Sequence, residues 1–173
     1  MKVTSFSPII SENAIIIILG SMPGKTSLQR QQYYAYGRNS FWYIMGDICG
    51  AHKDLSYTEK VQRLCEVGIA LWDVLKHCER EGSLDSKIDE ATEVPNDFES
   101  LLNAYPRIRH IFFNGQKAYQ AFRKRVWPGL SANIRDRVSL KTLPSTSAAH
   151  AALSNEDKLA RWHKHITFCL KNM

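Results

Sequence analysis

A short apolar segment near the start of the chain restricts its fold class more than any other feature. Residues 14–19 read AIIIIL, a β-branched run too short for a typical helix and long enough for one fully buried strand. Gly20-Ser21-Met22-Pro23-Gly24 follows directly and ends that strand. Strands buried on both faces are typical of parallel α/β sheets, whose ligand sites lie at the carboxyl ends of the strands. The loop at 20–24 is therefore the first candidate site.

The rest of the chain alternates strand and helix patterns. We expect further strands at 69–72, 109–113 and 138–143, and helices at 41–49, 58–66, 97–104, 115–125 and 155–170. Segment 79–96 is rich in Glu, Ser and Asp, shows no clear element, and is expected to wrap over the surface. The alternation predicts an α/β fold, a three-layer α/β/α sandwich around a four-stranded, mostly parallel sheet. A length of 173 residues suits one such domain over 1–173.

The charge of the chain indicates which class of molecule it binds. The formal net charge is +6, and basic residues gather around 25–38, 107–109, 117–125 and 135–137. Each cluster alone is typical of a solvated face, but together they favour a nucleic acid over a membrane or a neutral metabolite. No apolar run approaches the ~18 residues of a membrane span, and no signal peptide opens the chain, so a cytoplasmic location is expected.

Metal and redox chemistry have little support in the sequence. The four cysteines, Cys49, Cys65, Cys78 and Cys169, include no C-x-x-C pair. The histidines have no carboxylate or cysteine at metal-ligand spacing. We therefore expect reduced core thiols, no metal and no cofactor.

The loop after the first strand has the residue types of a pocket for a flat heterocycle. Its glycines allow close backbone approach, and Pro23 stiffens the turn. Tyr33 and Tyr34 offer ring faces for stacking. Asn39 adds an amide donor and acceptor without a charge, so any chemistry it performs depends on orientation.

Four segments together resemble one family. They are GSMPGKTSLQRQQYYAYGRNSFW near the start, GIALWDV, FFNGQKAYQAF, and LPSTSAAHA with the following EDKLARW. In these segments the chain resembles the uracil-DNA glycosylase superfamily, and specifically its hypoxanthine-DNA glycosylase branch. The resemblance implies a monofunctional, cofactor-free DNA glycosylase of base excision repair, active as a monomer on DNA that contains deaminated bases. Such an enzyme flips out hypoxanthine, with uracil as a second substrate, and hydrolyses the N-glycosidic bond.

The resemblance also implies roles for particular residues. It places the catalytic residue at Asn39, the stacking ring at Tyr34 and a reader of the base edge at Asp73. The base pocket would be lined by Gly20, Ser21, Met22, Pro23, Gly24, Tyr34, Asp73 and Asn114. Met22 stands where many relatives have a residue that positions the attacking water, a task that a thioether cannot perform.

Each of these roles has a simpler alternative. Asn39 precedes an expected helix, where asparagine is a common cap. Asp73 and Asn114 follow strands, where both residue types are common in turns. The sequence leaves both interpretations open at each position.

The last segment, 143–150, resembles the DNA-inserting loop of the family. Leu143 stands where the better-known form of the loop has histidine. The resemblance implies DNA contacts from Ser145, Thr146, Ser147 and His150, and Lys25 belongs to the basic residues near the first loop.

Two other functions remain possible from sequence. A non-catalytic DNA damage-binding module would use the same aromatic loop without cleavage. A nucleotide-dependent phosphotransferase is more distant: Gly24-Lys25-Thr26 reads like the end of a P-loop, but only three residues separate Gly20 from Gly24, and Pro23 lacks an N–H donor.

Overall fold

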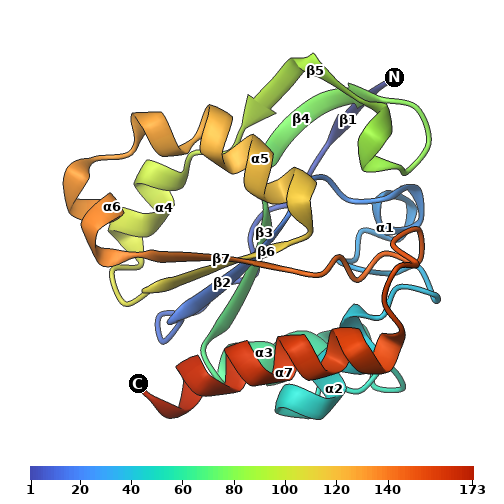
Figure 1. Cartoon of the computed structure of the whole chain (residues 1–173), viewed down its shortest axis with the longest axis vertical. Helices are drawn as coiled ribbons and strands as arrows, with labels where there is room; N and C mark the ends of the chain where they lie inside the picture. Colours follow the sequence, from blue (N-terminus) through green and yellow to red (C-terminus); the bar gives the residue numbers. More distant parts are fainter.

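The computed structural model describes all 173 residues and is organised around a four-stranded sheet (Figure 1). Its strands are β2 (Ile16–Gly20), β3 (Ile69–Asp73), β6 (His110–Asn114) and β7 (Ser139–Leu143). They lie in the order β3-β2-β6-β7, and every neighbouring pair is parallel. The predicted strands and the parallel sheet are confirmed, with boundaries that shift by one or two residues.

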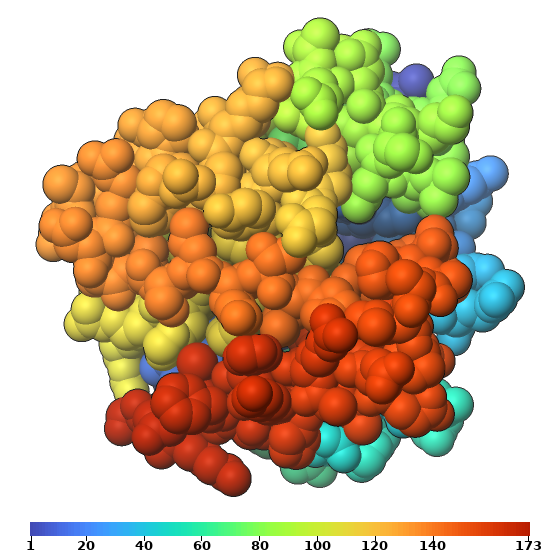
Figure 2. All heavy atoms as spheres, viewed as in Figure 1, coloured from blue at the N-terminus to red at the C-terminus, as the bar shows by residue number.

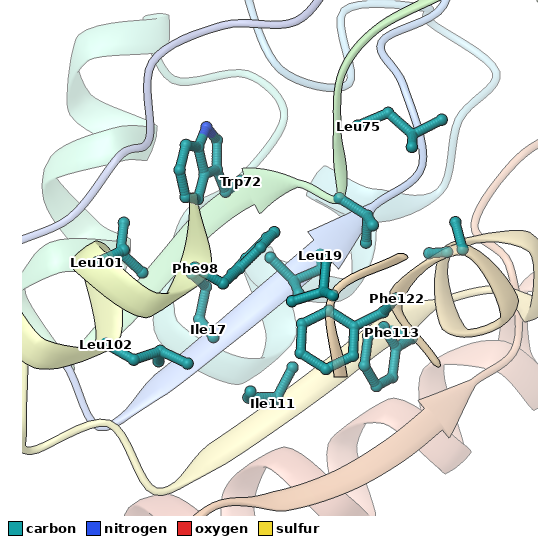
Figure 3. Packing of buried hydrophobic residues seen from close by; sticks show 14 of the residues in the cluster. Ile17, Leu19, Trp72, Leu75, Phe98, Leu101, Leu102, Ile111, Phe113 and Phe122 are labelled. Atoms are coloured by element: carbon teal, nitrogen blue, oxygen red, sulfur yellow. The ribbon is translucent and has the colours of Figure 1, made fainter. Parts of the chain in front are cut away.

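Helices cover both faces of this sheet, as the three-layer prediction requires (Figure 1). One face carries α2 (Phe41–Cys49), α3 (Tyr57–Glu66) and α7 (Asn155–Lys171), and the other carries α4 (Phe98–Ala104), α5 (Gln116–Arg125) and α6 (Ala132–Arg137). Strand β2 serves both layers because successive side chains point to opposite faces. Ile16 and Ile18 pack in the first layer. Ile17 and Leu19 pack in the second, among the residues that Figure 3 shows. This explains why the strand is apolar at every position.

A smaller antiparallel sheet lies beside the main one. It consists of β1 (Lys2–Thr4), β4 (Leu75–Arg80) and β5 (Ile88–Pro95), in the order β1-β4-β5, with a 3-10 turn, η1 (Asp85–Lys87), between β4 and β5. The expectation that 79–96 carries no element was therefore wrong. Strand β5 was missed because it lacks an apolar pattern. One of its buried residues is Glu93, which is 8% exposed and forms ion pairs with Lys117 at 2.6 Å and Arg125 at 3.1 Å.

Two short elements complete the chain: α1 (Lys25–Arg30) and a 3-10 turn, η2 (Trp127–Gly129). The six-residue helices α1 and α6 were not predicted, because six residues give too little hydrophobic periodicity to detect. No helix combines the length and the apolar character needed to cross a membrane.

The parallel sheet brings its four strand ends to one edge. Gly20 of β2 lies opposite Asp73 of β3, and Asn114 of β6 lies opposite Leu143 of β7. The loops that follow these residues are the four segments singled out from the sequence, and they now face one another.

Candidate active site at the carboxyl edge of the sheet

A cavity of about 410 Å³ opens at this edge of the sheet. In Figure 2 the early part of the chain, in blue, is visible between the β4–β5 segment, in green, and the loop after β7, in orange-red. The cavity lining includes all of the sequence-predicted site residues: Gly20, Ser21, Met22, Pro23, Gly24, Lys25, Tyr34, Asn39, Asp73, Asn114, Ser145, Thr146, Ser147 and His150. The structure therefore brings the candidates together, while their individual roles stay predictions.

Tyr34 is part of the cavity lining, and its ring is fixed by its neighbours. The ring stacks on Phe41 with centroids 3.9 Å apart and planes at 21°, and its backbone has a φ of 54°, unusual for a non-glycine residue. The hydroxyl is buried without a hydrogen-bond partner, and burial together with the charge of Asp73 raises the pKa of Tyr34. A strained backbone that fixes a ring beside a cavity is common at ligand sites.

Asp73 presents a carboxyl group that is almost fully withdrawn from solvent. Its exposed fraction is 4%, and its Oδ2 has no hydrogen-bond partner. Burial and the nearby charge of Asp85 raise the pKa of Asp73 to about 8, against the opposing effect of Arg80. The group is therefore a neutral carboxylic acid at neutral pH, able both to donate and to accept a hydrogen bond.

Gly20 makes room for this carboxyl group. A Cβ at position 20 would lie 2.6 Å from Asp73 Oδ1 and 3.3 Å from the Tyr34 hydroxyl. We expect Gly20→Ala to destabilise the fold by about 1–3 kcal/mol, the usual cost of overpacking, in thermal or denaturant unfolding. Gly24→Ala is the matched control, because its Cβ would meet only Ser83 atoms at an ordinary 3.7 Å. Equal effects of the two substitutions would contradict the proposed crowding.

The turn between β4 and β5 contributes residues that the sequence did not reveal. Ser21 Oγ donates to Asp85 Oδ1 at 2.5 Å, and the backbone N–H of Lys25 donates to Ser83 Oγ at 2.9 Å. Arg80, 2% exposed, donates from Nη2 to the Pro23 carbonyl at 2.6 Å. These contacts fix the turn against the 20–25 loop and place Asp85 in the cavity lining.

Asn39 lies just before α2, and its two side-chain atoms differ in their partners. Its Oδ1 accepts a hydrogen bond from the Phe41 backbone N–H at 2.9 Å, at the start of α2. The N-cap of α2 is Ser40, so the prediction of Asn39 as the helix cap was wrong: its oxygen instead closes a turn of two residues onto the first helical N–H. Its Nδ2 makes no hydrogen bond within the chain, and Asn39 lines the cavity. The hydrogen bond from Phe41 fixes the amide so that the free donor remains available to a ligand.

Asn114 and Thr146 hold the loop after β7 to the sheet. Asn114 Nδ2 donates to Thr146 Oγ1, and the Thr146 backbone N–H donates to Asn114 Oδ1, each at 2.9 Å. Thr146 is only 1% exposed, so its hydroxyl is unsuited to a phosphate contact. The contacts of Thr146 with Asn114 indicate that it positions the loop, in place of the predicted DNA contact.

The other predicted loop contacts are more accessible. Ser145 Oγ and Ser147 Oγ accept backbone N–H groups at 3.2 Å, which leaves each hydroxyl proton free to donate. His150 has a buried Nδ1 without a partner, and Lys25 is exposed.

The cysteines are free thiols, and no three His, Cys, Asp or Glu side chains converge on a metal site.

Comparison with known proteins identifies the family. A family model described as the uracil DNA glycosylase superfamily matches residues 8–168. The chain belongs to the uracil DNA glycosylase superfamily. A hypoxanthine DNA glycosylase of Methanosarcina acetivorans is 38% identical over 158 residues, covering 91% of this chain and 93% of that protein. One of Methanosarcina barkeri is 40% identical over 119 residues, covering 68% of this chain and 74% of that protein.

A solved structure of the superfamily has the same fold. The solution NMR structure of a protein from Methanosarcina acetivorans, described as a candidate uracil DNA glycosylase, superposes with a TM-score of 0.74. The two chains are 35% identical, and the match covers 95% of this chain and 98% of the other. The three-layer α/β/α fold predicted from the alternation of strands and helices is thereby confirmed.

Proposed function

We propose that this member of the superfamily is a monofunctional DNA glycosylase that acts, as a monomer, on DNA containing hypoxanthine and, secondarily, uracil. It flips the deaminated base into the 410 Å³ cavity and hydrolyses its N-glycosidic bond, leaving an abasic site for base excision repair. The observation that carries the proposal is the lining of this cavity, which combines a stacking ring, a free amide donor and a neutral carboxylic acid. Two relatives described as hypoxanthine DNA glycosylases support the choice of base.

The cavity suits the edge of hypoxanthine. That edge presents an N1–H donor beside the O6 acceptor, and uracil presents the same pair at N3–H and O4. A neutral carboxyl at Asp73 offers the complementary acceptor and donor, which a carboxylate would not. Tyr34 supplies a ring on which the flipped base stacks.

Cleavage of the bond places negative charge on the leaving base and positive charge on the sugar. The free amide donor of Asn39 is the proposed group that stabilises this charge separation, because a fixed dipole requires no reorganisation as the charges develop. The proposed DNA contacts are Lys25, Ser145, Ser147 and His150, which lie around the cavity.

The attacking water requires a polar group that Met22 cannot provide. Asp85 is the proposed substitute: its Oδ1 is held by Ser21, next to Met22 in the chain, and the side chain lines the cavity. Burial raises the pKa of Asp85, and the Ser21 hydrogen bond and the charge of Arg80 oppose this rise without cancelling it. An ionised carboxylate can orient a water molecule and accept its proton.

We expect Asp85→Asn to lower the single-turnover rate of excision about 10²-fold at neutral pH, within the range for loss of a general base. The matched control is Glu81→Gln, which removes the same charge from the same turn at a residue outside the cavity lining. Equal rates for the two variants would show that Asp85 acts only through the net charge of the turn.

A strand-scission assay tests the proposed function. Labelled DNA with one inosine is incubated with the protein and chelator, and abasic sites are then cleaved with alkali. Scission at the inosine supports the proposal, and binding without scission would indicate a damage-binding module. A protein that binds ATP with magnesium and leaves inosine DNA intact would instead be a phosphotransferase.

A further inference from the structure

Next to the first cavity, which we call the base cavity, lies a second, larger one. It measures about 780 Å³, and we call it the flanking cavity. Residues 30–43, Lys53, Lys60 and the segment 148–158 contribute to its lining. It shares Tyr34, Tyr36, Asn39 and His150 with the base cavity. The two cavities are therefore adjacent parts of one surface.

The flanking cavity is strongly positive. Its lining contains five basic side chains, Arg30, Arg38, Lys53, Lys60 and Lys158, and one carboxylate, Asp54. None of the five basic groups takes part in an ion pair. Unpaired cations around a concave surface attract an anionic ligand.

Lys158 is the most informative of these groups. It is only 2% exposed, and its Nζ donates to the carbonyls of His150 at 2.7 Å and Ser147 at 3.2 Å. Burial lowers the pKa of Lys158, and no carboxylate lies within ion-pair distance. A buried ammonium without a countercharge is costly. An anion in the cavity beside it would offset that cost.

The flanking cavity also offers aromatic surface. Tyr36 is 49% exposed and Tyr43 is 42% exposed, although large aromatic rings are usually buried. Lys60 Nζ lies 4.9 Å from the centroid of the Trp42 ring, in the same lining. Exposed rings next to unpaired cations are the combination that binds unpaired nucleotides, because rings stack on bases and cations neutralise phosphates.

We propose that the flanking cavity binds an unpaired nucleotide adjacent to the flipped one, with its phosphate among Lys53, Arg38 and Lys158 and its base on Tyr43 or Tyr36. The proposal rests on the proposed DNA glycosylase function, since the ligand is the neighbour of the flipped base. A base inside a duplex has both faces covered by its neighbours, so occupancy requires single-stranded or locally opened DNA. The cavity thereby favours substrates that are already unpaired around the lesion.

Two exposed residues allow a test that leaves the core intact. Tyr43→Ala is expected to weaken binding of inosine-containing single strands about 5- to 140-fold in fluorescence anisotropy, the range for loss of one stacked base. Tyr43→Phe keeps the ring and should bind like the wild type. Lys53→Gln should weaken binding and reduce the salt dependence by about one phosphate contact. Phe168→Ala and Lys171→Gln, both exposed on α7, are the controls and should bind unchanged.

The nucleotide can come from either strand, and paired substrates distinguish the two sources. A loss with Tyr43→Ala on both single strands and inosine duplexes assigns the cavity to the damaged strand. A loss on duplexes alone assigns it to the opposite strand. Equal binding of Tyr43→Ala, Lys53→Gln and wild type to both substrates would overturn the proposal.

A matched oligonucleotide without inosine separates this proposal from the proposed function. If the wild type fails to excise hypoxanthine, the glycosylase proposal fails. Selective weakening by Tyr43→Ala and Lys53→Gln on the inosine-free single strand would still support a cavity for unpaired nucleotides.

Discussion

Asn39→Ala is expected to reduce the single-turnover rate of hypoxanthine excision about 10²–10³-fold, the range for loss of one preorganised donor at a developing charge. The free Nδ2 of Asn39 is the group lost in this variant. Binding of inosine DNA should persist, because the proposed phosphate contacts lie on other side chains. Quenched-flow excision at saturating protein measures the rate, and anisotropy measures the binding.

The hydrogen bond of Asn39 to the start of α2 is the main competing explanation. Asn39→Ala also removes the acceptor of the Phe41 N–H, at a cost of about 1 kcal/mol in stability. Asn39→Asp retains that acceptor and lacks the amide donor, so its unfolding transition should match the wild type while its rate stays low. Recovery of the rate in Asn39→Asp would assign the effect to the lost hydrogen bond with Phe41 rather than to the donor.

The main sheet was predictable because each of its strands is recognisable from its own run of apolar residues. Strand β2 is apolar at every position, since Ile16 and Ile17 face different helical layers. Strand β5 gave no such signal. Its buried Glu93 is stabilised by Lys117 and Arg125 of α5, and the sequence of the strand alone does not reveal that pairing.

The candidate site was predictable to a similar degree. Gly20, Asp73, Asn114 and Leu143 end four parallel strands, and topology places such ends together. Asp85 was missed because its contact with Ser21 joins positions 64 residues apart and comes from the smaller sheet. The sequence grouped Arg30 and Arg38, but it did not connect them with Lys53, Lys60 and Lys158 of the flanking cavity, because these residues come from separate loops and helices.

The protonation state of Asp73 leads to the second large effect. Its pKa is raised to about 8, so we expect the rate of excision to fall as the pH rises through 8 and the carboxyl loses its donor proton. Asn has the same shape as the neutral acid and offers a donor and an acceptor at every pH. Asp73→Asn should therefore retain most activity at pH 7 and lose the alkaline decline. Asp73→Leu should be strongly impaired at every pH, and unequally for hypoxanthine and uracil.

Stability provides an independent measurement of the same proton. In the unfolded chain Asp73 ionises near its ordinary value of about 3.9, whereas the folded chain keeps the proton up to about pH 8. The unfolded state thus binds fewer protons between these values, so this group lowers the free energy of unfolding as the pH rises, and its effect levels off above 8. Relative to wild type, Asp73→Asn should gain stability from pH 4 to pH 8, whereas the exposed control Asp136→Asn should not. A constant difference between Asp73→Asn and wild type over that interval would mean that Asp73 is ionised in the fold, and the base edge would then face two acceptors instead of a donor and an acceptor.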